Sequence, residues 1–218
     1  MKPKTRVLIA DDHSVVRMGL ASLLGTAKSL EVVGEAFDGS DAVRKTLKLR
    51  PDVVVMDIVM PRKAGIAATE EILAAAPEPR VLILTTFGTS DDIARALKAG
   101  ASGAIMKSAT NRELLSAVQS VAAGKSYVSD EVEGLMANDP PAPELSQRQL
   151  EILDGIVRGL TNKDISTMLN ISFESVKSHV KLILSKLDAA SRTEAASIAQ
   201  RKGLIKQAWS SSDSSIVS

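Results

Sequence analysis

The first 123 residues alternate between short apolar runs and longer amphipathic stretches. The runs are nearly continuous in Val, Ile and Leu, as expected for the strands of a parallel sheet that is covered on both faces. We expect five strands, at Arg6–Ala10, Glu31–Ala36, Asp52–Met56, Arg80–Leu84 and Gly103–Met106. Helical spacing predicts helices at His13–Gly25, Ser40–Leu49, Ile66–Ala76, Asp91–Ala99 and Asn111–Ala123. This alternation predicts an α/β doubly wound domain, with a five-stranded parallel sheet, over residues 1–123.

The second half of the chain carries no strand pattern, and residues 145–209 fit an all-α domain of four helices. Capping-box patterns, in which a hydroxyl is followed three residues later by an acid or amide, mark several starts. The expected helices are Gln147–Arg158, Asn162–Leu169, Phe173–Leu187 and Arg192–Arg201. Residues 124–144 contain three prolines and are predicted to be a linker. The serine-rich residues 210–218 are predicted to be a disordered tail.

Composition narrows the class of protein. The chain has no cysteine, which excludes disulfides, thiolate metal sites and cysteine nucleophiles. No apolar run approaches the roughly 18 residues that a membrane helix needs. The basic start gives way to Asp11 and Asp12, so we predict no signal peptide and expect a cytoplasmic protein.

Charge is distributed unevenly along the chain. Residues 145–209 carry ten basic and six acidic side chains, a net charge of +4, whereas the whole chain has a net charge of +1. A basic segment on an otherwise acidic chain fits a polyanionic partner for that segment. Ordinary surface charge explains the imbalance equally well, so charge alone does not distinguish a polyanion-binding segment from an ordinary protein surface.

Three acidic residues fall at predicted strand ends. Asp11 and Asp12 follow the first strand and Asp57 follows the third, and these strand ends are neighbours in a doubly wound sheet. Crowded carboxylates repel one another, so the arrangement favours a hard divalent cation such as Mg²⁺. Thr85 and Lys107 end the fourth and fifth strands and would add a hydroxyl and a positive charge to the same crevice.

This set of side chains suits phosphoryl transfer. A carboxylate is a competent nucleophile toward phosphorus, and a metal ion with a lysine stabilises charge on the equatorial oxygens. Any one of these aspartates could be a helix cap or turn former, but that explanation is weak for five matched residues. A Mg²⁺-dependent phosphohydrolase remains an alternative, although the sequence shows neither a positioned base nor a substrate pocket.

The N-terminal domain resembles a response-regulator receiver. The carrying segments are Val7-Leu8-Ile9-Ala10-Asp11-Asp12-His13, Met56-Asp57-Ile58-Val59-Met60-Pro61 with Gly65, Leu84-Thr85, and Ala99-Gly100-Ala101-Ser102-Gly103 leading to Lys107. The resemblance implies that Asp57 is the phosphoacceptor. It implies that Asp12, Asp57 and the carbonyl of Val59 ligate Mg²⁺ with help from Asp11, and that Thr85 and Lys107 bind the phosphoryl group.

Two positions depart from the receiver pattern. Ala104 stands where many receivers have an aromatic residue, and Ser108 follows the lysine where many have proline. Without an aromatic ring at residue 104, a change at Thr85 would have to be transmitted through other residues. Val59 and Phe87 are expected to flank the phosphoryl group, where apolar side chains would exclude water and lengthen its lifetime.

The helices expected at residues 162–169 and 173–187 are separated by a tight turn through Asn170, Ile171 and Ser172. On the second helix, Val176, Val180, Ile183 and Leu187 have helical spacing and should face a core. Lys177 and Lys181 share another face, from which a helix in the major groove reaches phosphates or base edges. Taken alone, two such lysines fit a solvated bundle helix better.

Leu145–Ile205 resembles a LuxR-type helix-turn-helix. The resemblance rests on Gly159-Leu160-Thr161-Asn162-Lys163-Asp164-Ile165, Leu169-Asn170-Ile171-Ser172, Ser175-Val176-Lys177-Ser178-His179-Val180, and Lys186-Leu187 with Arg192. It implies a set of DNA-binding residues: Asn162, Lys163, Ser175, Val176, Lys177, His179 and Lys181. With the receiver, the pattern is similar to the NarL/FixJ family of two-component response regulators.

The resemblance implies a DNA-binding transcription regulator, not an enzyme with a turnover substrate. A sensor histidine kinase would phosphorylate Asp57 with Mg²⁺ present. The receiver would then release the DNA-binding domain or change its dimer contacts, and a homodimer would bind two half-sites. A DNA-binding regulator whose receiver is a non-phosphorylated dimerisation module remains the alternative.

Overall fold

A computed structural model describes residues 3–86 and 89–205 of the chain. The chain divides into two compact units, Met1–Pro141 and Ala142–Ser218, and each is considered separately. The end expected for the second domain at residue 209 and the tail expected at 210–218 lie outside the described residues. Within the described ranges, no helix combines the length and apolarity needed to cross a membrane.

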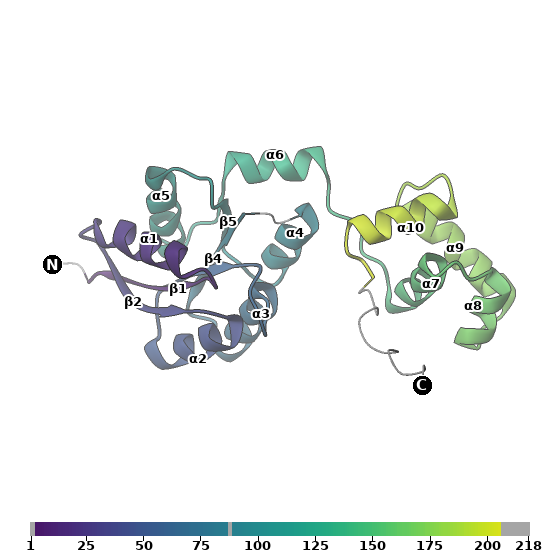
Figure 1. Ribbon diagram of the computed structural model, residues 1–218, viewed down its shortest axis with the longest axis horizontal. Helices are drawn as coiled ribbons and strands as arrows, with labels where there is room; N and C mark the ends of the chain where they lie inside the picture. Colours follow the sequence, from purple (N-terminus) through teal and green to yellow (C-terminus); the bar gives the residue numbers. More distant parts are fainter. Residues whose placement is uncertain (1–2, 87–88, 206–218) are drawn as a thin grey trace, which may run out of the picture. The chain divides into compact units, whose positions relative to one another are not determined.

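The first unit is built around a parallel sheet whose strands have the order β2-β1-β3-β4-β5-β6 (Figure 1). The five apolar runs form strands close to their predicted bounds, and most side chains of β1, β3, β4 and β5 are buried on both faces of the sheet. These strands are β1 (Thr5–Ala10), β2 (Leu30–Ala36), β3 (Val53–Asp57), β4 (Arg80–Thr85) and β5 (Gly103–Met106). The doubly wound α/β class predicted from the sequence is confirmed.

The sheet has six strands, so the prediction of five was wrong by one. The sixth strand, β6 (Tyr127–Val128), is only two residues long and pairs in parallel with Gly103 and Ala104 of β5. A Cβ atom on Gly103 would lie 2.2 Å from the carbonyl oxygen of Tyr127. The glycine therefore allows β6 to approach, whereas two residues are too short to show a strand period in the sequence.

Helices cover both faces of this sheet (Figure 1). One face packs against α1 (Ser14–Gly25) and α5 (Asn111–Ala122), and the other packs against α2 (Gly39–Leu49), α3 (Gly65–Ala75) and α4 (Ser90–Lys98). Each face has its own apolar core. All five helices begin and end within one residue of the predicted bounds.

The segment expected to be a linker, residues 124–144, contains regular structure. After β6 it forms α6 (Asp130–Asn138), which is capped by the Ser129 side chain. Val132 of α6 is fully buried, in the same core as α2, α3 and α4. Most of this segment is therefore packed as part of the first unit.

The second unit contains four helices in its described part: α7 (Gln147–Val157), α8 (Asn162–Leu169), α9 (Phe173–Lys186) and α10 (Arg192–Arg201). Capping boxes start α7 at Ser146 and α8 at Thr161, as the sequence predicts. Ile152, Ile165 and Ile183 from three of the helices meet in one apolar core. The all-α class predicted for this half is confirmed.

We expect Gly103→Ala to destabilise the first unit by about 1–3 kcal/mol, because the added methyl group forces β6 away from β5. Gly19→Ala is the control, since a Cβ atom at Gly19 meets nothing within 4 Å. Alanine in this exposed helix position should stabilise the unit by about 0.5–1 kcal/mol. Urea unfolding followed by circular dichroism measures both changes, and equal stability of the two variants would contradict the tight β5–β6 approach.

Candidate functional site

Three carboxylates converge at the carboxyl edge of the sheet. β1 and β3 are adjacent strands, so Asp11 and Asp12 after β1 come close to Asp57 at the end of β3. Ligand atoms of these three residues and of His13 all lie within 4.8 Å of one another. The side chains expected to converge from the sequence are thus brought together.

Lys107 lies between two of the carboxylates. Its Nζ atom is 2.6 Å from Oδ2 of Asp11 and 2.7 Å from Oδ2 of Asp57. Asp11 and Asp57 are only 1% and 4% exposed, so both are desolvated and depend on this ammonium for charge compensation. One lysine balances one of the three carboxylates, and the crevice keeps an excess of negative charge.

The two carboxylate oxygens of Asp11 have different partners. Oδ2 forms the ion pair with the ammonium of Lys107. Its Oδ1 atom accepts a hydrogen bond from the backbone N–H of His13 at 2.8 Å. Oxygens of three carboxylates whose ligand atoms lie within 4.8 Å of one another fit a hard cation such as Mg²⁺.

The other expected residues line a cavity of about 460 Å³ together with Asp12 and Asp57. Thr85 is completely buried, and its Oγ1 has no hydrogen-bond partner among the described residues. Val59 is 66% exposed at the rim of the cavity. Phe87, expected on the opposite side, lies outside the described residues.

The protonation of this site is perturbed. Burial raises the pKa of Asp57 above its ordinary value of 3.8, and the charge of Asp11 adds to the effect, while Lys107 opposes it. Burial by itself would lower the pKa of Lys107, but the hydrogen-bonding and charge interactions with Asp11 and Asp57 raise it overall. Lys107 therefore stays charged, whereas Asp57 holds its proton to a higher pH than an exposed aspartate does.

A glycine allows the loop after β3 to fold tightly behind Asp57. The N–H of Gly65 donates to the carbonyl oxygen of Ile58 at 2.9 Å. A Cβ atom on Gly65 would lie 1.9 Å from the carbonyl oxygen of Asp57, so no other residue fits. The loop that carries Val59 is therefore closed by close backbone packing at α3.

Sequence reasoning left three cavity residues without a role: His13, Val16 and Thr86. His13 lies beside the carboxylates, with its Nδ1 atom 2.8 Å from Oδ1 of Asp12. Thr86 directly follows β4 and His13 directly follows the acidic pair after β1, and these positions are the signal that could have identified them.

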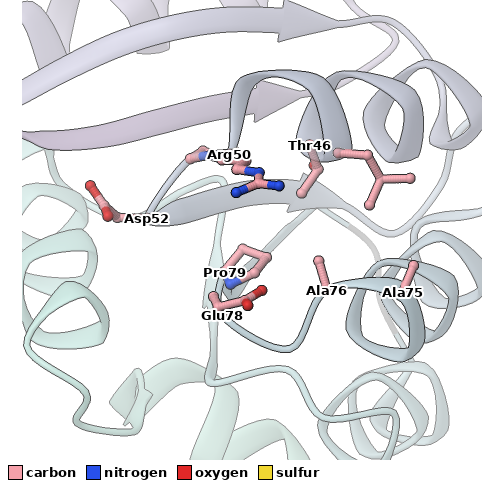
Figure 2. Close-up of a pocket in the computed structure, with 9 residues that line it drawn as sticks. Thr46, Arg50, Asp52, Ala75, Ala76, Glu78 and Pro79 are labelled. Atoms are coloured by element: carbon pink, nitrogen blue, oxygen red, sulfur yellow. The ribbon is translucent and has the colours of Figure 1, made fainter.

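A second cavity lies between α2 and α3 (Figure 2). It measures about 340 Å³ and is lined by residues such as Thr46, Arg50, Asp52 and Pro79. Asp52 and Pro79 directly precede β3 and β4, so this cavity lies at the amino edge of the sheet. Ligands of doubly wound folds bind at the carboxyl edge, which favours the carboxylate crevice as the functional site.

The second unit contains the predicted helix–turn–helix pair, α8 and α9. Asn170 ends α8 in the left-handed conformation, with φ 50° and ψ 51°. The Ser172 side chain then caps α9 by accepting from the N–H of Ser175 at 3.1 Å. The turn expected through Asn170 and Ser172 is therefore present, and it fixes the angle at which α9 leaves α8.

The polar face of α9 carries Lys177 and Lys181, both exposed, and Lys163 is exposed on α8. Ser175 and His179 are half-buried on the same helix α9. The Oδ1 atom of Asn162 accepts a hydrogen bond of 2.6 Å from Arg192, which connects the start of α8 to α10.

Val176 is the one residue of the expected DNA-binding set that is fully buried. It is 0% exposed and packs in the core of the second unit, so the expectation that it contacts DNA is corrected. The physical reason is its spacing of four and seven residues from Val180 and Ile183, which places all three on the buried face of α9.

Two families match the chain along its length. Residues 7–119 match the response regulator receiver domain, and residues 143–199 match the bacterial regulatory proteins of the luxR family. Together these matches cover both compact units.

Similar proteins show the same arrangement over nearly their whole length. The chain is 39% identical over 208 residues to the transcriptional regulatory protein LiaR of Bacillus subtilis, covering 92% of this chain and 99% of LiaR. It is 36% identical over 214 residues to the oxygen regulatory protein NreC of Staphylococcus haemolyticus, with the same coverage. The crystal structure of ChrA, a response regulator of a heme-sensing two-component system, has 42% identity and a TM-score of 0.55 over 93% of this chain and 99% of that chain.

We expect Mg²⁺ to raise the melting temperature of the first unit at pH 7 and to lose this effect in acid. The raised pKa of Asp57 means that a proton displaces the cation as pH falls through that value, which lies above 3.8. Saturation at about 100 times Kd would stabilise the folded state by about 2.7 kcal/mol. Thermal unfolding with and without Mg²⁺, from pH 7 down to pH values at which Asp57 is protonated, measures the effect.

Asp57→Asn should remove most of this stabilisation, whereas Glu70→Gln, at an exposed carboxylate of α3, should keep it. A Mg²⁺ effect that is equal in both variants would show that the cation binds elsewhere.

Proposed function

Because the chain belongs to the two-component response regulators that join a receiver to a LuxR-type DNA-binding domain, we propose that phosphorylation of Asp57 by a sensor histidine kinase controls its binding to DNA. One observation carries the proposal. Lys107 bridges Asp11 and Asp57, and it lines one cavity with Asp57 and Thr85, so nucleophile, hydroxyl and ammonium share one site.

The transfer step uses the Asp57 carboxylate as nucleophile. An oxygen of Asp57 forms a bond to phosphorus while the bond from phosphorus to the imidazole nitrogen of the kinase breaks, and the imidazole leaves with the bonding electrons. The carboxylate must be deprotonated for this attack, so the raised pKa of Asp57 predicts faster transfer at neutral than at acidic pH.

The charges around Asp57 suit the product. Lys107 already contacts Oδ2 of Asp57, so its ammonium is placed to bind an oxygen of the new phosphoryl group. The Thr85 hydroxyl, buried and without a partner among the described residues, is a donor for a second oxygen. The phosphoryl group would give the Thr85 hydroxyl an acceptor and would give the Lys107 ammonium a further anionic partner.

Asp11, Asp12 and Asp57 would hold Mg²⁺ together with the carbonyl oxygen of Val59. When bound, Mg²⁺ supplies the positive charge that neutralises the carboxylates and stabilises negative charge on the phosphoryl oxygens. Asp57 serves both as ligand and as nucleophile, and Asp11 is buried beside Lys107 to complete the charge balance.

The output of the protein is DNA binding through α9. Lys177 and Lys181 project from its exposed face and would enter the major groove, where a lysine reaches phosphates as well as base edges, while Lys163 and His179 would contact the backbone beside the groove. Asn162 and Ser175 complete the contact set at the starts of α8 and α9. A phosphorylated homodimer would place two such helices on two half-sites. We assign the chain no turnover substrate, in keeping with relatives that are named as regulators.

Beryllofluoride, a mimic of the phosphoryl group, tests the first half of the proposal. With Mg²⁺ present it should convert the full chain from monomer to dimer in a light-scattering measurement of mass. Asp57→Ala should abolish the change, whereas Glu70→Ala should leave it intact, because Glu70 is an exposed acid outside the cavity. Fluorine NMR reports bound beryllofluoride in the same samples. Bound mimic without a mass change would contradict dimerisation, and absence of bound mimic would contradict the phosphoacceptor site.

Lys177→Ala tests the second half on a random-sequence duplex. Loss of one phosphate contact should reduce the slope of log K against log salt by about 0.9. Arg148→Ala, which removes the same charge from α7, is the matched control and should keep the slope. Both variants should bind beryllofluoride normally. Equal salt slopes for Lys177→Ala and the unmodified chain would exclude this lysine from the DNA contact.

A further inference from the structure

Helix α6 packs on β5 at Ala104. The N–H of Ser129, which caps α6, donates to the carbonyl oxygen of Ala104 at 3.1 Å. Val132 of α6 is 0% exposed and shares an apolar core with Ala104, and Leu135 and Met136 pack against the same core. Ala104 has no side chain beyond Cβ, and this small residue leaves room for α6 directly over the strand.

Side-chain hydrogen bonds connect both ends of α6 to loops of the carboxyl edge. At the start of the helix, the hydroxyl of Ser108 donates to the Glu131 carboxylate, with its Oγ atom 3.0 Å and 3.3 Å from the two carboxylate oxygens. At the end of the helix, the hydroxyl of Ser90 donates to Oδ2 of Asp139 at 3.2 Å. These two contacts span 23 and 49 residues of sequence, so neither is a local turn.

The two loops follow β4 and β5, the strands whose ends position the proposed phosphoryl-binding side chains. Ser108 directly follows Lys107, and Ser90 begins α4 after the loop that follows Thr85. The two loops are themselves connected, because the N–H of Lys107 donates to the carbonyl oxygen of Thr85 at 2.7 Å. Because Ser108 is the residue next to Lys107, a movement of Lys107 toward a phosphoryl group would act directly on the partner of Glu131.

We propose that α6 senses the state of the phosphoryl site: it is held down when Asp57 is unmodified and loosens when Lys107 and Thr85 turn to a phosphoryl group. The inference rests on the proposed function, because it needs Asp57 to accept the group. Helix α6 is followed within three residues by the end of the first unit at Pro141. Its loosening changes the segment through which the chain continues to the DNA-binding unit.

Coupling of this kind is reciprocal. If the mimic loosens α6, then weakening the attachment of α6 must make the mimic bind more tightly. The two directions can be measured separately, with a reporter on α6 and with the affinity of the cavity.

The chain has no cysteine, so a single engineered thiol reports on α6 alone. In Val132→Cys the thiol is buried while α6 is docked, and its alkylation rate measures undocking. Mg²⁺ and beryllofluoride should raise this rate by about tenfold, within the usual range of allosteric coupling. Val118→Cys, at an equally buried position of α5 in the other core, is the matched control and should not respond.

Glu131→Ala, added to the Val132→Cys chain, removes the attachment to Ser108. It should raise the alkylation rate without the mimic and tighten beryllofluoride binding by about fivefold. Glu133→Ala removes the same charge from the same helix, at an exposed residue on α6, and should change neither value. Equal effects of the two variants would overturn the role of Glu131.

Failure of the inference and failure of the proposed function give different results. If fluorine NMR shows no bound beryllofluoride in the unmodified chain, the phosphoacceptor assignment fails. If the mimic binds and neither Val132→Cys nor a second reporter, Met136→Cys, changes its alkylation rate, then α6 does not sense the site. Met136→Cys serves as the reporter if Val132→Cys already reacts as a free thiol without the mimic.

Discussion

The charge balance around Lys107 is the constraint on which the first unit depends. Asp11 and Asp57 are buried at adjacent strand ends, and a single ammonium lies within 2.7 Å of a carboxylate oxygen of each. Buried like charges stay ionised only with such compensation. Burial and the Asp11 charge raise the pKa of Asp57 in spite of Lys107, so this single ammonium does not fully compensate the charge of the site. The fold holds these charges together by parallel pairing of β1 with β3 and of β4 with β5.

The β5 edge of the sheet is covered by β6 and α6. Without β6 and α6, β5 would be an edge strand with unpaired backbone groups. Gly103 and Ala104, both without large side chains, let β6 and α6 approach closely. The same packing attaches α6 to Ser108, which follows Lys107, and to Ser90, which begins α4. The segment that protects this edge of the sheet is thus also the one that we propose to respond to the state of Asp57.

In the second unit, one face of α9 is buried in the apolar core and the opposite face is exposed. Val176, Val180 and Ile183 anchor the helix in the core, and Lys177 and Lys181 remain at the surface. The left-handed Asn170 and the Ser172 cap fix where α9 begins. This anchoring presents the lysines on a rigid surface, which is what readout of a major groove requires.

The sequence by itself determined the two fold classes, the long helices and strands, and the five residues of the carboxylate site. Their signals are local: apolar periods, capping hydroxyls, and polar residues at strand ends. Only the tertiary structure decided that Lys107 bridges Asp11 and Asp57 and that Val176 is fully buried. It also decided that the proline-containing segment includes a sixth strand and α6. A two-residue strand has no period to detect, and a short helix with one fully buried residue acquires its place from the partner surface at Ala104, which is distant in sequence.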